Sequence, residues 1–218
     1  MSKTLVFCDF DGTVSVQDIG HEVIKHFMNG NWQEIDEEYA SGKIGSKFAY
    51  ERIASLLKVT AREMAEYALS LETMDPYFHE FYEFCKERQI DLKILSDGLD
   101  FYIDLILKRH GLDEIEFFSN LIRFHDDSSV FIDFPRFNKQ CAKCGTCKKA
   151  VLEQCRTHYN NIIYVGDGYS DVCPSQFADL VFGKKFLYEK CRHQKRACIH
   201  YRNFGDIKET LQNGRHLV

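Results

Sequence analysis

The stretch Leu5-Val6-Phe7-Cys8-Asp9-Phe10-Asp11-Gly12-Thr13 decides how this chain folds. Its first part is an apolar run of β-branched and aromatic residues, which is typical of a buried β-strand. The run ends in two carboxylates one residue apart, Asp9 and Asp11, and then in Gly12 and Thr13, which break the strand. Because the chain already turns at a strand end, the two carboxylates can converge on one point. Open α/β sheets bind their ligands at such strand ends.

Three further segments follow in the chain, namely Ile94-Leu95-Ser96-Asp97-Gly98, Lys148 and Gly166-Asp167-Gly168-Tyr169-Ser170-Asp171. Taken alone, the first stretch could merely cap a helix, because a short motif needs its context. The four ordered motifs together resemble the haloacid dehalogenase (HAD) superfamily of phosphatases, which use an aspartate nucleophile. This resemblance spans nearly the whole chain. It implies an α/β fold with a parallel, Rossmann-like sheet at its core.

The composition is that of an ordinary globular protein, with 218 residues, 44% hydrophobic and 28% charged. The net charge of -5 argues against a nucleic-acid or membrane-surface partner, because no basic excess can neutralise phosphates. No apolar run reaches the roughly 20 residues that cross a bilayer. The nine cysteines come without a signal-peptide pattern, which favours a reducing compartment. We therefore expect a cytoplasmic protein.

Between the first and second core strands, the apolar periodicity predicts helices in succession rather than a βα alternation. They are expected near residues 18–28, 32–40, 46–57 and 60–71, with a break at 29–31 and Ser46 as an N-cap. Consecutive helices at this place indicate an inserted helical cap, of the C1 type in the superfamily. The predicted cap covers residues 16–72, and the catalytic core covers 1–15 and 73–218.

The rest of the chain returns to the core pattern. A β-hairpin is expected from residues 122–124 and 130–132, and a buried strand at 162–165. The last core strand is predicted at 180–182, followed by a polar tail and a helix near 206–212.

The resemblance assigns chemical roles to the first stretch. Asp9 would attack phosphorus and form an aspartyl-phosphate, which divides one difficult step into two easier ones. Asp11 would protonate the leaving oxygen and later activate water. An acid that acts near neutral pH needs a raised pKa, and we expect the neighbouring charge of Asp9 to raise it.

The same resemblance implies a Mg²⁺ cofactor, since a carboxylate and a phosphate do not approach each other without a cation. The expected ligands are the Asp9 carboxylate, the backbone carbonyl of Asp11 and the carboxylate of Asp167. Asp171 would hold these ligands in position without binding the ion itself.

Phosphate binding is assigned to the remaining motif residues. The hydroxyl of Ser96 would donate to a phosphoryl oxygen, together with the amide of Asp97 or Gly98, and Gly12 lies on the phosphate side. Lys148 would pair with the nucleophile and the phosphate, at the start of a helix that runs through residue 158. Lys149 is the alternative lysine.

Three cysteines, Cys141, Cys144 and Cys147, have a C-x-x-C-x-x-C spacing that suggests zinc. Zinc prefers four ligands, so Cys155 or His158 would have to supply the fourth. The alternative is a loop of free thiols that shapes the entrance to the Lys148 helix.

The segment from Cys141 to Lys148, with Asp133-Phe134-Pro135 before it, resembles the methionine-salvage enol-phosphate phosphatases. Their substrate is 2-hydroxy-3-keto-5-methylthiopentenyl 1-phosphate. The run from Gly166 to Pro174 is instead nearer the phosphocholine/phosphoethanolamine phosphatases. Asp18 falls where phosphoserine phosphatases carry a glutamate that meets the substrate amine, whereas Phe48 would suit an apolar substrate.

The sequence thus predicts a Mg²⁺-dependent phosphatase of a small phosphorylated metabolite, with the enol phosphate as the leading substrate. Phosphocholine, phosphoethanolamine and phosphoserine are the alternative substrates. An alternative of another class is a catalytically idle protein that binds zinc or senses redox state through its cysteines. The sequence gives no indication of the oligomeric state.

Overall fold

The computed structural model describes residues 3–28, 32–71 and 73–214. Within these residues the strands form a seven-stranded sheet in the order β4-β3-β2-β1-β5-β6-β7. The strand β4 runs antiparallel to β3, and all other neighbouring strands are parallel. The bounds are β1 Thr4–Cys8, β2 Asp91–Leu99, β3 Phe117–Phe124, β4 Val130–Asp133, β5 Asn161–Gly166, β6 Leu180–Gly183 and β7 Ile199–His200.

The central strand β1 explains why its sequence is apolar throughout. It pairs with β2 on one side and β5 on the other, and all of its residues are buried. Leu5 and Phe7 face one apolar cluster, while Val6 and Cys8 face the other. A strand that is covered on both faces has no polar side, so alternation is lost.

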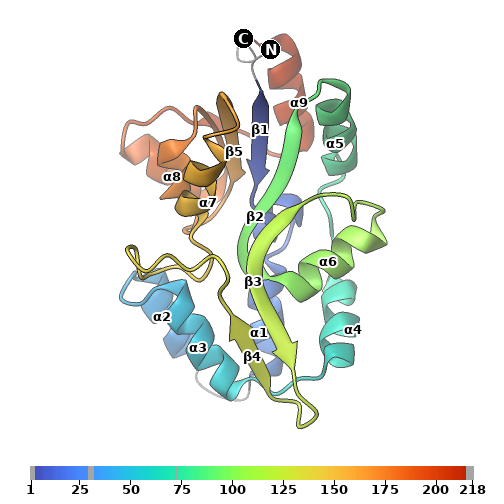
Figure 1. The fold of residues 1–218 in the computed structure, drawn as a ribbon, viewed down its shortest axis with the longest axis vertical. Coiled ribbons are helices and arrows are strands. Elements are labelled where there is room, and N and C mark those ends of the chain that lie inside the picture. The colour runs from blue at the N-terminus through green and yellow to red at the C-terminus, as the bar shows by residue number, and fades with distance from the viewer. Residues whose placement is uncertain (1–2, 29–31, 72, 215–218) are drawn as a thin grey trace.

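Helices cover both faces of the sheet (Figure 1). The helices α5, α6 and α9 lie on one side, and α7 and α8 lie on the other. Their bounds are α5 Phe78–Glu87, α6 Asp100–Arg109, α7 Lys148–Cys155, α8 Lys185–His193 and α9 Phe204–Asn213. This arrangement confirms the predicted α/β class.

The chain between β1 and β2 holds four helices in the described residues, as predicted. They are α1 Ile19–Phe27, α2 Trp32–Ala40, α3 Ser46–Leu56 and α4 Ala61–Leu71. They lie at the end of the molecule toward which β1 runs (Figure 1). The predicted break at 29–31 lies outside the described residues, and the division into core and cap domains stays a prediction.

Two helix ends were predicted with the wrong residues. Ser46 does not cap α3, because Gly45 holds that position without a side-chain cap. The Ser46 hydroxyl instead accepts a hydrogen bond from the Gly145 amide at 3.0 Å. The helix that starts at Lys148 ends at Cys155, three residues before the predicted end.

The polar tail predicted after β6 is also wrong. This region contains α8 and the two-residue strand β7. Helix α8 buries only Leu187 and Cys191, which are four residues apart on one face. So narrow an apolar stripe within a basic segment is hard to recognise in a sequence.

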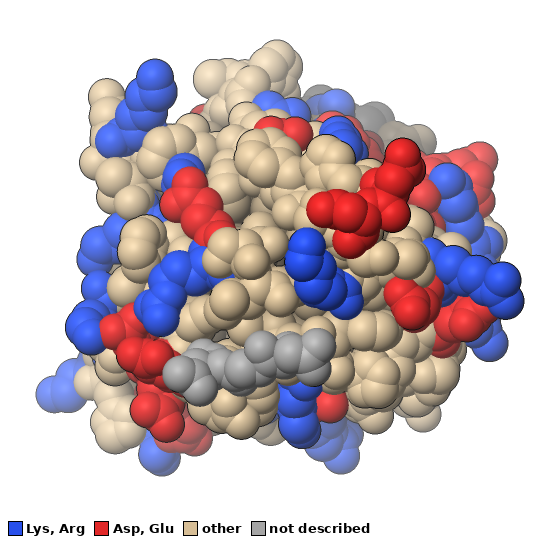
Figure 2. Space-filling view, turned by 90° about the horizontal axis from the view of Figure 1, so that it is seen from below, with Lys and Arg blue, Asp and Glu red and all other residues tan. Residues whose placement is uncertain are grey.

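Positive and negative side chains are interspersed on the surface. Figure 2 shows this mixture on the face seen from below in Figure 1, where Lys and Arg alternate with Asp and Glu. In the described part of the chain, no helix combines the length and the apolar character that a membrane span requires.

The aromatic contact between α5 and α9 gives a test of the packing. Phe204 is fully buried, and its ring lies 4.8 Å from that of Phe78 and 5.2 Å from that of Phe81. Phe204→Ala should lower the free energy of unfolding by about 3–5 kcal/mol, because a large cavity is left. Urea titration would show a lower midpoint at an unchanged slope. Phe131→Ala, at a side chain that is 55% exposed, should cost about 0.5 kcal/mol; similar costs for both variants would contradict this account.

Candidate active site

The predicted catalytic residues meet where the chain leaves β1 and β5. Asp9 directly follows β1, and its amide donates a hydrogen bond to the carbonyl of Val165 in β5 at 2.9 Å. Asp167 directly follows β5. The strand order changes direction between β1 and β5, because β2 and β3 lie on one side and β6 and β7 on the other. Ligand sites of open α/β sheets lie at this kind of switch point.

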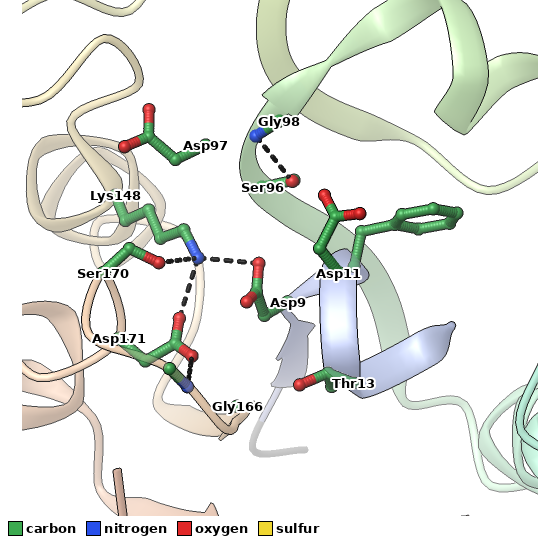
Figure 3. Close-up of polar contacts among 12 residues, drawn as sticks. Asp9, Asp11, Thr13, Ser96, Asp97, Gly98, Lys148, Gly166, Ser170 and Asp171 are labelled. Atoms are coloured by element: carbon green, nitrogen blue, oxygen red, sulfur yellow. Dashed lines mark hydrogen bonds and ion pairs between the residues drawn. The ribbon is translucent and has the colours of Figure 1, made fainter. Parts of the chain in front are cut away.

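Lys148 occupies the centre of the site (Figure 3). Its Nζ donates to Oδ1 of Asp9 and Oδ1 of Asp171, each at 2.7 Å, and to Oγ of Ser170 at 3.1 Å. Burial by itself would lower the pKa of Lys148, but the charges of Asp171 and Asp9 outweigh it and hold this pKa well above its usual value. Lys149, the alternative lysine, lies outside the site and pairs with Glu153 at 3.6 Å.

The carboxylates of Asp9, Asp167 and Asp171 form the cluster expected for a metal. Within the described residues, one ligand oxygen from each lies within 4.8 Å of the others, and all three residues are buried. Burial and then the charge of Asp171 raise the pKa of Asp9, against the opposing effect of Lys148. Such a set of oxygen ligands fits a hard divalent cation, which would relieve this repulsion.

Asp171 shapes the loop after β5. Its Oδ1 accepts from Lys148 Nζ and from the hydroxyl of Tyr164, both at 2.7 Å. Its Oδ2 accepts from the amides of Asp167 and Gly168, both at 2.9 Å. With both oxygens engaged in this way, Asp171 is placed to orient Asp167 and Lys148.

Lys185 is a neighbour of the cluster that the sequence reasoning missed. Its Nζ donates to Oδ2 of Asp167 at 2.8 Å, from a left-handed backbone with φ of 46°. Burial and Asp171 raise the pKa of Asp167, and the charge of Lys185 counteracts them. No motif marks this lysine, because only the packing of β6 beside β5 brings it near Asp167.

Asp11 has the environment of a carboxylic acid that is protonated near neutral pH. Its Oδ2 accepts from the hydroxyl of Tyr102 at 2.6 Å, and its Oδ1 accepts from the Gly20 amide at 3.1 Å. Burial, and then the charge of Asp18, raise the pKa of Asp11 to about 7. The predicted direction is confirmed, but the predicted cause is wrong, because Asp18 and not Asp9 is the neighbouring charge that contributes.

Two glycines are required at their positions. Gly12 has a φ of +73°, and a Cβ there would lie 2.4 Å from Oδ2 of Asp167. A Cβ on Gly98 would lie 2.0 Å from the hydroxyl oxygen of Tyr102 and 2.6 Å from Oδ2 of Asp11. Both glycines therefore let the backbone approach catalytic side chains closely.

The segment Ser96–Gly98 lies within β2 rather than beyond it. The buried hydroxyl of Ser96 accepts from the Gly98 amide at 2.9 Å. The Asp97 carboxylate points away from Asp9 in Figure 3 and accepts from the Thr146 amide at 2.9 Å and from Nδ2 of Asn120 at 3.1 Å. Its side chain thus connects β2 to the loop that carries Lys148.

The cysteine loop lies immediately before Lys148. Cys141 is exposed, whereas Cys147 is buried. Burial raises the pKa of Cys144 to about 12. In the described residues, the carboxylates of Asp9, Asp167 and Asp171 form a set within 4.8 Å of one another, but these three thiols do not. The zinc site stays a prediction.

A cavity of about 300 Å³ opens above the carboxylates, and the helices between β1 and β2 form its roof. The predicted residues Asp9, Asp11, Asp18, Ser96 and Asp167 line its floor and rim. The roof is mostly apolar and aromatic, with three polar side chains for which the sequence predicted no place in the site. The roof residues are Ile24, Trp32, Ile35, Tyr39, Ala49, Tyr50 and Ile53, together with the polar His21, Asp36 and Ser46.

Phe48 was expected to contact an apolar substrate, and this expectation is wrong. The Phe48 side chain is 52% exposed and is absent from the cavity lining. Its neighbours Ala49 and Tyr50 face the cavity instead, with Ile53 one turn further along α3. A helical periodicity identifies a face of α3, but only the packing decides which face covers the site.

Comparison with known proteins places these features in context. A family model described as "Putative Phosphatase" matches residues 4–201. The chain is 29% identical to a 2-hydroxy-3-keto-5-methylthiopentenyl-1-phosphate phosphatase of Brevibacillus brevis, over 97% of both chains. It is 30% identical to the protein of the same name from Geobacillus kaustophilus, over 100% of both. A solved phosphoserine phosphatase, a phospho-aspartyl intermediate analogue, is 23% identical with a TM-score of 0.73, over 96% of this chain and 99% of that chain. This likeness confirms the predicted HAD-like fold.

The raised pKa of Asp11 predicts a pH-dependent stability. Asp11 has a folded-state pKa of about 7 and an ordinary value of 3.8, so the folded protein binds the extra proton. Its contribution to stability is therefore complete below about pH 4 and is lost as the pH rises through 7. Asp11→Asn should gain stability relative to the wild type between pH 5 and pH 8, by about 1–3 kcal/mol. Urea unfolding at both pH values, with a chelator present, measures this difference.

Asp206 offers a control in the same experiment. Arg202 lowers its pKa to about 2, so both its folded and ordinary values lie below pH 5. The effect of Asp206→Asn should accordingly be equal at the two pH values. If the effect of Asp11→Asn is equally flat, Asp11 is not protonated in the folded protein near neutral pH.

Proposed function

Because this chain belongs to the phosphatase family whose model spans residues 4–201, we propose that it hydrolyses a small phosphomonoester through an aspartyl-phosphate on Asp9. We propose 2-hydroxy-3-keto-5-methylthiopentenyl 1-phosphate, the substrate in the names of its relatives, as the physiological one. The observation that carries the proposal is the buried contact of Lys148 with Asp9 beside a cavity that Asp9 and Asp11 help to line.

In the first step an oxygen of Asp9 attacks phosphorus, and the bond between phosphorus and the ester oxygen breaks. Asp11 gives its proton to that oxygen as the bond breaks, so the leaving group departs as a neutral alcohol or enol. A pKa of about 7 suits this exchange at neutral pH, because the proton is present and yet easily given up. Tyr102 holds the acid in place through its bond to Oδ2.

In the second step water attacks the phosphorus of the aspartyl-phosphate. Asp11, now ionised, takes a proton from this water, and the bond between phosphorus and Asp9 breaks. Inorganic phosphate leaves, and both carboxyl groups return to their starting states. Lys148 lies within 2.7 Å of Asp9, so its charge is placed to stabilise negative charge on the phosphoryl oxygens in both steps.

The cofactor that we propose is Mg²⁺, held by Asp9 and Asp167 with Asp171 behind them. When bound, it would neutralise charge on the carboxylates and on the phosphoryl group. The residues fit such an ion, because three buried carboxylates offer oxygen ligands that lie within 4.8 Å of one another. Asp9 must be ionised to attack, and burial opposes its ionisation unless positive charge compensates.

The residues that form the roof of the cavity favour the enol phosphate as the substrate. Ile24, Trp32, Ile35 and Ile53 present apolar surface above the polar floor. A leaving group with oxygens near the ester and a thioether tail at its far end would place polar atoms below and apolar atoms above. The four helices of the insertion, which we propose as a cap domain, would then select the substrate.

A second candidate is a phosphate ester that carries an amine, such as phosphocholine, phosphoethanolamine or phosphoserine. Asp18 and Asp36 line the same cavity as Trp32, and an aromatic ring beside carboxylates suits an ammonium group. Asp18 is however engaged as the N-cap of α1, where it accepts from the His21 amide at 2.8 Å. This engagement favours the enol phosphate.

We also propose that the protein works in the cytoplasm. All nine cysteines are free thiols in the structure, as expected where thiols stay reduced.

Replacing the nucleophile tests the mechanism. Asp9→Asn keeps the shape of the side chain but removes the attacking charge, so kcat should fall by several orders of magnitude while the fold persists. Lys148→Met should have a comparably severe effect, and Lys149→Met should have almost none, because Lys149 pairs with Glu153 on the surface. Phosphate release with and without Mg²⁺ measures activity, and circular dichroism checks the fold. Near-normal turnover by a folded Asp9→Asn protein would refute the covalent mechanism.

A substrate panel tests the choice of substrate. The wild type should prefer the enol phosphate over phosphoserine and phosphocholine by at least about tenfold in kcat/KM, or 1.4 kcal/mol. Asp36→Ala should leave this activity almost unchanged, since an uncharged leaving group does not need the carboxylate. If an amine-bearing ester is instead preferred and loses its preference in Asp36→Ala, the second candidate is correct.

A further inference from the structure

We propose that Tyr50 recognises an oxygen atom of the leaving group, so that the site selects phosphate esters with a carbonyl or hydroxyl group next to the ester carbon. This inference rests on the proposed phosphatase function and assigns the specificity of the same site to one residue of the inserted helices.

The hydroxyl of Tyr50 is placed to meet a ligand. Tyr50 belongs to α3 and lines the cavity, and its hydroxyl makes no hydrogen bond with any part of the chain that the structure describes. Burial, and then the charges of Asp97, Asp11 and Asp18, raise the pKa of Tyr50 well above its usual value. The hydroxyl therefore keeps its proton and can donate it in a hydrogen bond. A ligand oxygen that reaches this hydroxyl would therefore gain a hydrogen bond for which the described chain offers no competing acceptor.

The carboxylates around Tyr50 accept hydrogen bonds from other parts of the chain. Asp11 accepts from Tyr102 and Gly20, and Asp18 accepts from the His21 amide. Oδ1 of Asp97 accepts from Asn120 and from the Thr146 amide, whereas Oδ2 of Asp97 is buried without a hydrogen-bond partner in the described residues. None of these carboxylates accepts from Tyr50 in the described structure, so the hydroxyl of Tyr50 can donate to a carbonyl or hydroxyl oxygen of the ligand.

The position of Asp11 indicates which ligand atom lies there. Asp11 protonates the ester oxygen, so the atoms next to Asp11 belong to the start of the leaving group. Tyr50 lines the same cavity as Asp11 and Gly98, and Tyr102 donates directly to Asp11. A donor at this place therefore reaches an oxygen on the carbon next to the ester carbon, beyond the oxygen that Asp11 protonates.

Tyr39 provides an internal comparison, because it lines the same cavity with a hydroxyl that likewise has no partner in the described residues. The ring of Tyr39 packs edge-on against that of Tyr169 at 5.8 Å. Tyr169 belongs to the loop between Asp167 and Asp171, so Tyr39 lies toward the phosphoryl end of the cavity. Every substrate has the phosphoryl group, so Tyr39 should contribute equally to kcat/KM for all esters. Tyr50 should contribute only for esters that offer its hydroxyl an acceptor.

Hydroxyacetone phosphate and propyl phosphate form a matched pair of probes. Both have three carbons, and only the first has a carbonyl next to the ester carbon. Tyr50→Phe should lower kcat/KM for hydroxyacetone phosphate by about tenfold, as the loss of one hydrogen bond to a buried group predicts. Its effect on propyl phosphate should stay within about twofold. Tyr39→Phe should lower both values by the same factor.

The outcomes separate this inference from the proposed function. If Tyr50→Phe lowers kcat/KM equally for both probes, or for neither, Tyr50 does not recognise the leaving group. The inference then fails while the phosphatase function stands. If the wild type hydrolyses no phosphomonoester of either kind, the proposed function itself fails.

The wild type alone gives a second test, which does not depend on the folding of a variant. Its kcat/KM should be at least about tenfold higher for hydroxyacetone phosphate than for propyl phosphate. Equal values would overturn the inference.

Discussion

The buried ammonium group of Lys148, between the carboxylates of Asp9 and Asp171, is the interaction on which the rest of the structure depends. Its side chain is only 2% exposed, and both of its ion-pair distances are 2.7 Å. A charge that is removed from water requires partners, and breaking such a buried pair typically costs about 3–5 kcal/mol. The end of β1, the start of α7 and the loop after β5 must therefore hold a fixed relation to one another.

The sheet supplies that fixed relation. β1 lies between β2 and β5, and its register with β5 places Cys8 beside Val165, one residue before Asp9. The carboxylate that follows β1 and the one that follows β5 consequently emerge side by side. The same geometry gathers three buried carboxylates beside Lys148 and Lys185, and this set of oxygen ligands fits a divalent cation.

The inserted helices also take part in the chemistry at the floor of the site. Asp18 starts α1 by accepting the His21 amide, and its charge helps to raise the pKa of Asp11. The Ser46 hydroxyl accepts from Gly145, two residues before the buried Cys147 that precedes Lys148. The contacts that attach these helices thus reach Asp11 and the loop that carries Lys148.

The sequence by itself determined the sheet core and the candidate catalytic groups at its edge. A fully apolar run that ends in Asp9 and Asp11 is recognisable as a buried central strand, and Asp167 follows a strand in the same way. Ser96 instead lies within β2, and Lys148 begins α7. These features depend on local patterns, which a single sequence displays. The helices between β1 and β2 were recognised for the same reason, as were the antiparallel strands β3 and β4.

Only the tertiary structure decided which side chains meet across the site. Lys185 reaches Asp167 because β6 lies beside β5, and Tyr102 reaches Asp11 from α6, 91 residues further along the chain. The face of α3 that covers the cavity, with Tyr50 rather than Phe48, follows from how the helix packs. Contacts between residues distant in the chain depend on the summed packing of many elements, and no local pattern in the sequence encodes them.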